Sequence, residues 1–330
     1  MRKIHEKSLC CEEAVVRFGG RRRQCARCRR TWSLYQHRRG RKPKRGLKEL
    51  ARRYLANAQL SSHARAAVTG KPADRFEGAL KRSRDLFLRT TPWHPLPDTW
   101  PLIAVADAFI KRIGGRWRTL YLILIRRPHD THAVIAPLIL KDGLETRAGW
   151  SEAFVRLPRT VQRAVRVLVC DGHRGLTDHA KHQGWLLQRC HFHLIAAVQG
   201  RRSRWGKSLH RAEGEQAYRL VKTALTTFND DELLRSLRSV EDLALSTTSP
   251  QLRRILLGFR NASEDYRTYL NHPELHVPST SNSAESFFSL VEQFCRRTRG
   301  FVSTDSFMRW LTALAKNKQV IACRERNQQN

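Results

Sequence analysis

The sequence has few acidic residues for its length. It contains 29 Asp and Glu against 62 Lys and Arg in 330 residues, which gives a formal net charge of +33. This imbalance excludes an acidic or charge-balanced metabolic enzyme as the expected class. The basic residues are spread along the whole chain, and this distribution favours a long polyanion such as DNA or RNA as the partner, with an anionic membrane surface as the second choice.

Long hydrophobic runs are also lacking. The first residues contain no apolar segment of a secretory signal, and the longest apolar runs, such as residues 120–125, are too short to span a bilayer. We therefore expect a soluble, cytoplasmic protein that does not enter a membrane. Apolar residues still make up 41% of the chain, which is enough for one sizeable core with a small additional module, or for two domains.

Four of the eight cysteines lie within the first 28 residues. Because no secretory signal accompanies them, metal binding or simple burial is expected rather than disulfide formation. Cys25 and Cys28 have Cys-x-x-Cys spacing, and the basic run HRRGRKPKRG follows at residues 37–46. Residues 1–46 are therefore predicted to form a small metal-bound module with a flexible basic linker.

The basic linker and the segment after it are candidates for DNA contact. The linker could lie in a minor groove, where narrow A·T tracts favour arginine, or it could touch phosphates without a defined position. Helical spacing of apolar residues predicts three short helices over residues 47–90, the last at about 74–88. This segment is interpreted either as a helix-turn-helix-like DNA-binding unit or as a helical linker with a cationic face. The candidate contacts in the linker are Arg39, Arg41, Lys42, Lys44 and Arg45.

A proline- and tryptophan-rich stretch, TTPWHPLPDTWP at residues 90–101, marks a domain boundary. After it, three apolar and β-branched runs predict a meander of strands, and alternating helices and strands follow, so the expected fold class is α/β. Residues from about 194 to 275 have helical patterns and are interpreted as a helical insertion. The predicted elements are strands at 100–110, 117–126 and 132–140, a helix at about 150–165, strands at 166–170 and 185–190, and helices at about 282–295 and 304–322.

Three acidic residues stand where a metal-dependent nuclease would need them. Asp107 lies at the end of the first predicted strand, Asp171 follows the buried-type strand RVLVC, and Glu285 is one turn into a helix that opens with STSN. Two-metal phosphodiester chemistry needs carboxylates that converge on ions about 3.5–4 Å apart, and Mg²⁺ prefers a few carboxylates together with water. The simpler interpretation is that an Asp after a strand forms a turn or caps a helix.

Three sequence blocks occur in a recognisable order: DGHRGL at 171–176, QRCHFHL at 188–194 and STSNSAESFFSLVEQFCRRTRGF at 279–301. They resemble the signature of bacterial insertion-sequence transposases of the Mutator-like group, in the DDE superfamily. The resemblance covers about residues 92–322 and implies an RNase H-like catalytic domain with a helical insertion before the final Glu. It further implies a catalytic triad that binds Mg²⁺ or Mn²⁺, formed by Asp107, Asp171 and Glu285.

The resemblance also implies an activity. Such a protein binds the terminal inverted repeats of its element, nicks DNA to free 3′-OH ends and joins these ends to target DNA without a covalent protein–DNA intermediate. The chain would contribute positioning and charge stabilisation, with Arg174 as a candidate DNA contact whose alternative role is structural. Because two DNA ends must be joined, we expect a homodimer or larger synaptic complex, associated with the nucleoid in a bacterial cytoplasm.

Two clusters of Cys and His are candidate Zn²⁺ sites under the same resemblance. The family's Cys-x-x-His motif matches Cys190 and His193, and His272 with His276 would complete a four-ligand site. The alternative is that Cys190 is a buried thiol and that His193 contacts DNA or backbone.

The N-terminal cysteines resemble the zinc ribbons that often begin these transposases, in which two Cys-x-x-Cys knuckles face each other. Only one knuckle is intact here. Because the adjacent Cys10 and Cys11 are not expected to serve together in a normal knuckle, His5 is a candidate fourth ligand, and a degenerate finger is the alternative. The expected ligands are Cys10, Cys25 and Cys28.

The predicted insertion begins with a basic stretch, QGRRSRWGKSLHR at residues 199–211. Its basic side chains could follow phosphates while the Trp205 indole stacks on an unpaired base, or Trp205 could lie in a helical core. The candidate DNA contacts are Arg201, Arg202, Arg204 and Trp205.

Two other functions are compatible with the sequence. One is a catalytically silent, transposase-derived DNA-binding protein that keeps the scaffold, and the other is an RNase H-like nuclease directed by DNA structure. In either case residues 323–330 are expected to form a short tail.

Overall fold

The computed structural model describes residues 10–18, 22–33, 73–202, 211–297, 301 and 303–323, without the side chains of residues 33, 73–79, 201–202 and 297. The chain forms two compact units, Met1–Glu49 and Leu50–Asn330, which are described separately. Within the described ranges, no helix is both long and apolar enough to cross a membrane.

The smaller unit contains a three-stranded antiparallel sheet. Its strands are β1 (Val15–Phe18), β2 (Arg22–Cys25) and β3 (Thr31–Ser33), with β2 in the centre. Cys25 ends β2 and is fully buried. Its backbone N–H donates to the Arg30 carbonyl and its carbonyl accepts from the Arg29 N–H, so the Cys-x-x-Cys segment forms a tight turn between β2 and β3.

The larger unit is built on one mixed sheet of seven strands in the order β10-β6-β5-β4-β8-β9, with β7 also paired to β5. The long strands β4 and β5 are antiparallel, β8 lies parallel to β4, and β9 lies parallel to β8. The strands are β4 (Leu102–Ile113), β5 (Arg116–Arg126), β6 (His132–Ile135), β7 (Ile139–Asp142), β8 (Val165–Cys170), β9 (Leu186–Arg189) and β10 (Val320–Ala322).

Both faces of this sheet are covered by helices, because each strand alternates buried apolar residues between two cores. Ile103 and Val105 face a core shared with α12 and α13, whereas Ala104 and Ala106 face a core shared with α4 and α6. Helix α3 packs on α13. These helices are α3 (Ala73–Thr90), α4 (Arg147–Val155), α5 (Arg159–Ala164), α6 (Arg174–Gln183), α12 (Asn282–Arg297) and α13 (Thr304–Lys318).

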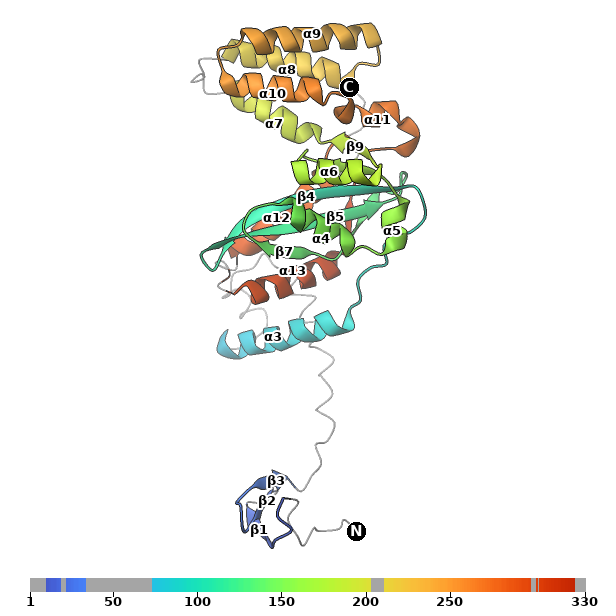
Figure 1. Ribbon diagram of the computed structural model, residues 1–330. Coiled ribbons are helices and arrows are strands. Elements are labelled where there is room, and N and C mark those ends of the chain that lie inside the picture. Colours follow the sequence, from blue (N-terminus) through green and yellow to red (C-terminus); the bar gives the residue numbers. More distant parts are fainter. Residues whose placement is uncertain are drawn as a thin grey trace. The chain divides into compact units, whose positions relative to one another are not determined.

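A group of helices between β9 and α12 has a core of its own. Helices α7, α8, α9 and α10 pack side by side (Figure 1), and shorter turns return the chain to β9. This confirms the helical character predicted for about residues 194–275. The elements are α7 (His191–Arg202), α8 (Arg211–Thr226), α9 (Asp230–Ser246), α10 (Pro250–Asn261), η1 (Glu264–Tyr266), α11 (Thr268–Asn271) and η2 (Pro273–Leu275).

Prolines account for two differences from the predicted elements. The single strand expected at 132–140 is two strands, β6 and β7, because Pro137 has no N–H to continue the ladder. The single helix expected at about 150–165 is likewise divided into α4 and α5 at Pro158. Among the described residues, the other predicted strands and the helix at about 282–295 are confirmed, α3 corresponds to the helix expected at about 74–88, and the helix expected at about 304–322 ends at Lys318.

Residues 320–322, which were predicted to end this helix, form the strand β10 instead, because three residues after a helix give no periodic signal of their own. It adds an antiparallel edge to β6, with Ile321 opposite Ala133. The other two helices expected in residues 47–90, the basic linker and its candidate contacts lie outside the described residues.

Candidate active site

Asp107 and Asp171 lie at the same level of neighbouring parallel strands. Val105 of β4 is paired with Val169 of β8, and each aspartate follows two residues later. Residues two apart on a strand point to the same face, so both carboxylates continue the side of the sheet that packs against α12. The parallel register is therefore what brings together two residues 64 positions apart.

The Asp107 carboxylate is buried, with 7% of its side chain exposed. Oδ1 accepts a hydrogen bond of 2.8 Å from the Ala108 N–H, whereas Oδ2 has no hydrogen-bond partner among the described residues. Burial is the largest influence and raises the pKa of Asp107; the interaction with His193 lowers this pKa, and the charges of Glu285 and Asp171 raise it. A buried carboxylate oxygen without a partner is costly unless a cation accompanies it.

Asp171 begins the turn between β8 and α6. Its Oδ1 accepts from the His173 N–H at 2.8 Å, and the next residue, Gly172, has a φ of +93°. This backbone conformation favours glycine, and a Cβ atom at Gly172 would also lie 2.2 Å from the Arg189 guanidinium, which would have to move. The turn leaves the Asp171 carboxylate half-buried at the end of the sheet.

Glu285 lies in the first turn of α12, at the same end of the sheet as Asp171. The start of α12 is connected to the start of α7 by three hydrogen bonds. The N–H and the Oγ–H of Ser281 both donate to Cys190 Sγ, at 3.2 and 3.3 Å, and the His191 N–H donates to the Ser279 carbonyl at 2.9 Å. These bonds place the first turns of the two helices beside each other.

His193, in the first turn of α7, lies between two of the carboxylates. Its Nε2 is 3.2 Å from Glu285 Oε1 and 3.8 Å from Asp107 Oδ2. The interaction with Asp107, followed by that with Glu285, raises the pKa of His193 to about 11. The 3.8 Å separation exceeds a hydrogen bond, so we attribute the Asp107 contribution to charge attraction. One potential ligand atom from each of Asp107, His193 and Glu285 lies within 4.8 Å of the others.

Glu145, in the loop before α4, is a further acidic residue near this edge that the sequence analysis did not identify. Its Oε1 accepts from the Trp150 Nε1–H at 2.6 Å and lies 3.3 Å from His173 Nδ1. Burial raises the pKa of Glu145, and the charges of Asp171 and Asp107 contribute in the same direction. No spacing in the sequence indicated Glu145, because only the folded loop brings it to the sheet edge.

The four residues expected to form a zinc site beside the insertion contact different neighbours in the structure. Cys190 contacts Ser281, and His193 lies among the carboxylates. His272 Nδ1 is 3.3 Å from Glu274 Oε1, and the His276 ring packs 4.3 Å from that of His129. Among the residues that the structure describes, these four form no group of potential metal ligands. The zinc site beside the insertion therefore stays a prediction that this arrangement does not support.

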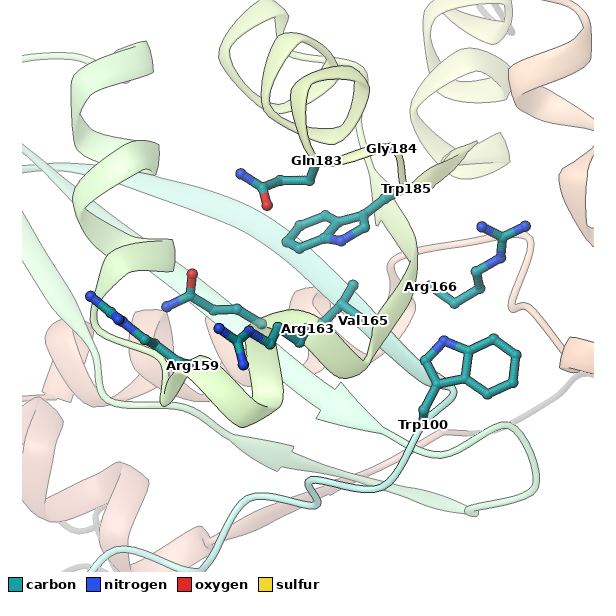
Figure 2. Close-up of a pocket in the computed structure, with 9 residues that line it drawn as sticks. Trp100, Arg159, Arg163, Val165, Arg166, Gln183, Gly184 and Trp185 are labelled. Carbon is teal, nitrogen blue, oxygen red and sulfur yellow. The ribbon is translucent and has the colours of Figure 1, made fainter.

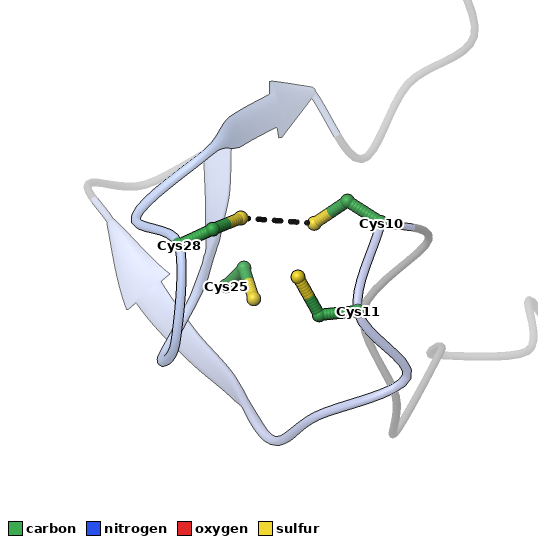
Figure 3. Close-up of side chains that lie close together, drawn as sticks. All are labelled: Cys10, Cys11, Cys25 and Cys28. Carbon is green, nitrogen blue, oxygen red and sulfur yellow. Dashed lines mark hydrogen bonds between the residues drawn. The ribbon is translucent and has the colours of Figure 1, made fainter.

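The N-terminal cysteines do come together in the smaller unit. Ligand atoms of Cys10, Cys11, Cys25 and Cys28 lie within 4.8 Å of one another, and Cys10 Sγ is 3.3 Å from Cys28 Sγ (Figure 3). Hydrogen bonding, chiefly with Cys28, raises the pKa of Cys11 to about 12. The expectation that only one of the adjacent cysteines takes part is corrected, because the turn at 10–12 directs both side chains inward. His5 lies outside the described residues.

The remaining candidate DNA contacts are placed only in part. The Arg174 side chain is 93% exposed at the start of α6, and its Nε lies 3.8 Å from Asp178 Oδ2. Because of this exposure, the guanidinium can contact a phosphate from the solvent side. Arg201 and Arg202 lie in the last turn of α7, but their side chains, like all of Arg204 and Trp205, are outside the described part of the chain.

Comparison with known proteins identifies the family. No curated protein matches the chain. The profile described as "Transposase, Mutator family" matches residues 130–321, a stretch that contains Asp171, His193 and Glu285 and begins after Asp107. Because the match covers more than half of the chain, the protein belongs to the Mutator family of transposases.

Proposed function

We propose that this transposase is a DDE enzyme of a bacterial insertion sequence that binds the element's terminal inverted repeats, nicks DNA to free 3′-OH ends and joins them to target DNA. Two observations support the proposal: Asp107 and Glu285 belong to one group of potential metal ligands, and Asp171 lies level with Asp107 on the neighbouring parallel strand. The enzyme would act as a homodimer or larger synaptic complex on nucleoid DNA in the cytoplasm.

The sheet supports an RNase H-like assignment for this catalytic unit. Three antiparallel strands, β4, β5 and β6, are followed by β8 and β9, which lie parallel to β4. The proposed catalytic carboxylates occupy the central strand β4, the end of its neighbour β8, and a helix after the insertion. We take residues 92–322 as this domain, and residues 47–90 as a DNA-binding segment.

The residues at the sheet edge suit Mg²⁺ or Mn²⁺. Asp107 Oδ2 is a buried atom without a hydrogen-bond partner among the described residues, and carboxylate oxygens are the ligands that these ions prefer. Asp107, Asp171 and Glu285 would hold the ions. When bound, such ions supply charge stabilisation for the attacking and leaving oxygens of a phosphodiester.

The chain's own groups fix the geometry of the site. The β4–β8 ladder holds Asp107 and Asp171 level, and the Ser281–Cys190 contacts hold Glu285 and His193 beside them. His193 offsets part of the negative charge of Asp107 and Glu285, which would otherwise repel each other. Rigid elements therefore supply preorganised carboxylates at the reacting phosphate.

Nicking and strand transfer on DNA that carries the gene's own flanking ends tests this proposal. We expect Asp107→Asn, Asp171→Asn and Glu285→Gln each to reduce 3′-end cleavage on the order of a thousand-fold or more, because each removes an ion ligand. Matched controls are Asp178→Asn and Glu292→Gln, which change carboxylates in ion pairs on α6 and α12. End binding without cleavage in all proteins would indicate a silent DNA-binding relative, and cleavage governed by DNA structure would indicate a structure-specific nuclease.

We also propose that the four N-terminal cysteines hold Zn²⁺, because four thiols at one point match a tetrahedral structural site. Metal analysis of the full chain should find one zinc, lost in Cys25→Ser and in Cys11→Ser but kept in Cys323→Ser, whose thiol lies in the other unit. Retention of zinc in Cys11→Ser would contradict the four-cysteine site. A loss that Cys323→Ser shares would show that the metal is held elsewhere.

A further inference from the structure

A cavity of about 530 Å³ opens at the beginning of the parallel strands. Its walls come from Trp100, two residues before β4, from α5 and the start of β8, and from the turn between α6 and β9. Its volume lies within the range of sites that bind small molecules or single nucleotides. Its charged and aromatic lining consists of Trp100, Arg159, Arg163, Arg166 and Trp185 (Figure 2).

Three arginines give the cavity a strong positive charge. Arg159 and Arg163 are one turn apart on α5, and Arg166 is the second residue of β8. All three are exposed, and within the described part of the chain none of their guanidinium groups forms an ion pair or a hydrogen bond. No acidic residue lines the cavity. Uncompensated guanidinium groups around one cavity attract a phosphate, which each can bind through two donors.

Two tryptophans supply flat apolar surface beside these charges. Trp100 is 67% exposed, and Figure 2 places it with Arg166 on the side of the cavity opposite Arg159 and Arg163. Trp185 is half-buried and is held edge-on against Phe154, with ring centroids 5.4 Å apart. An exposed indole next to arginines is the combination that stacks on a nucleobase while its phosphate is neutralised.

The cavity is well separated from the carboxylates. Residues 100, 166 and 185 stand at the amino-terminal ends of β4, β8 and β9, whereas Asp171 follows the last residue of β8 and Asp107 lies in the middle of β4, just beyond its last pair with β8. Six residues of strand separate Val165 from Asp171, which corresponds to about 20 Å. A DNA duplex rises about 3.4 Å per nucleotide, so this distance corresponds to about six nucleotides.

We propose that this cavity binds an unpaired nucleotide of a DNA strand, with Arg159, Arg163 and Arg166 on its phosphates and Trp100 stacked on its base. The choice of DNA rests on the family's activity on DNA and on the charge and the indoles of the cavity. The site is a second point of contact, remote from the proposed chemistry, for a strand that has left the duplex. Binding here does not require the carboxylates to bind metal.

The test measures binding of a fluorescent single-stranded DNA oligonucleotide to the full chain in chelator, so that no cleavage can occur. We expect Arg159→Gln/Arg163→Gln/Arg166→Gln to weaken binding about ten-fold or more at low salt. The slope of log affinity against log salt should become shallower by about 2, because each lost phosphate contact on a single strand contributes about 0.7. The matched control, Arg235→Gln/Arg238→Gln/Arg254→Gln, removes three exposed arginines from α9 and α10 and should leave the slope nearly unchanged.

The stacking role is tested separately with Trp100. Trp100→Ala should weaken single-strand binding roughly ten-fold, with little effect on duplex binding, because only an unpaired base can stack. Trp100→Phe should restore most of the loss. Trp117→Ala is the control, since Trp117 is a comparably exposed tryptophan (51%) at the β4–β5 turn. Because these side chains are exposed, circular dichroism should show the variants folded.

Three results would overturn the proposal. Equal changes of slope in the two triple-arginine variants would show that the cavity has no special part in binding. Equal losses in Trp100→Ala and Trp117→Ala would remove the stacking role. If the cavity variants weakened binding of an RNA oligonucleotide and left binding of the DNA oligonucleotide unchanged, the cavity would be an RNA site. None of these outcomes depends on nicking. The cavity proposal can therefore fail while the proposed transposase chemistry holds, and the chemistry can fail while the cavity proposal holds.

Discussion

The two ends of the parallel strands differ in charge and in burial. Just beyond the carboxyl-terminal end of the β4–β8 pairing, Asp107 is buried and Asp171 is half-buried, and Glu285 and His193 approach from helices. At the amino-terminal ends, three exposed arginines and Trp100 surround an open cavity without acidic residues. One sheet thus separates a negative, partly desolvated site from a positive, solvated one.

This difference indicates how a strongly basic chain keeps a negative site. With 29 acidic against 62 basic residues, acidic side chains are scarce, yet the charges of Asp171 and Glu285 raise the pKa of Asp107, and those of Asp171 and Asp107 raise the pKa of Glu145. Carboxylates concentrated there repel DNA phosphates unless cations intervene. The basic end attracts DNA without that requirement, so we expect chemistry and strand binding to be separable.

The largest expected effect is this separation of functions. Asp171→Asn should abolish nicking while leaving single-strand affinity in chelator within about two-fold of wild type, because its effect is confined to the carboxylate end. The triple-arginine variant of the cavity should show the opposite pattern on a short DNA substrate that ends before the cavity. Nicking assays and anisotropy titrations on the same preparations check both. If either variant lost both functions, the two ends would be one site.

A smaller effect is expected on stability. The raised pKa of Asp107 means that its negative charge is unfavourable in the folded state. In chelator, Asp107→Asn should therefore raise Tm, by about 2–4 °C for each kcal/mol recovered in a domain of this size. Scanning calorimetry with Glu292→Gln as the surface control checks this. A lower Tm for Asp107→Asn would show that attraction to His193 outweighs the cost of burial.

The smallest effect is the pH dependence of the stability difference between the wild type and Asp107→Asn. Below the ordinary carboxyl pKa of 3.8, Asp107 is protonated in both folded and unfolded chains and carries no charge penalty. As pH rises, the unfolded chain ionises first, so the wild type loses stability relative to Asp107→Asn until the folded-state pKa is passed. Chemical denaturation in chelator should show a larger gap at pH 7 than at pH 4. A constant gap would mean that Asp107 ionises equally in both states.

Much of the larger unit could be predicted from local sequence. The apolar runs of β4, β5 and β8 and the helical patterns of α12 and α13 are strong periodic signals. Asp171 and Glu285 could be predicted because recognisable sequence blocks surround them. Asp107 could be predicted because it stands in an apolar run that indicates a buried strand. Where prolines interrupt a pattern, as at Pro137 and Pro158, the expected single elements are two.

Other features depend on contacts between distant segments and gave no local signal. His193 faces Asp107 and Glu285 only because Ser281 contacts Cys190 across 91 residues of sequence. Glu145 reaches the sheet edge through a hydrogen bond from Trp150 in a loop of no distinctive pattern. The cavity likewise combines three segments that only the parallel register places at one edge.

The most direct test of the central claim is a change of metal preference at one proposed ligand. Asp171→Cys replaces a hard oxygen ligand by a softer thiolate, which disfavours Mg²⁺. We predict that this variant is inactive in Mg²⁺ and regains measurable end nicking in Mn²⁺, while Asp178→Cys cleaves in both. Equal activity of Asp171→Cys and Asp178→Cys in Mg²⁺ would contradict the claim that Asp171 holds a catalytic metal ion.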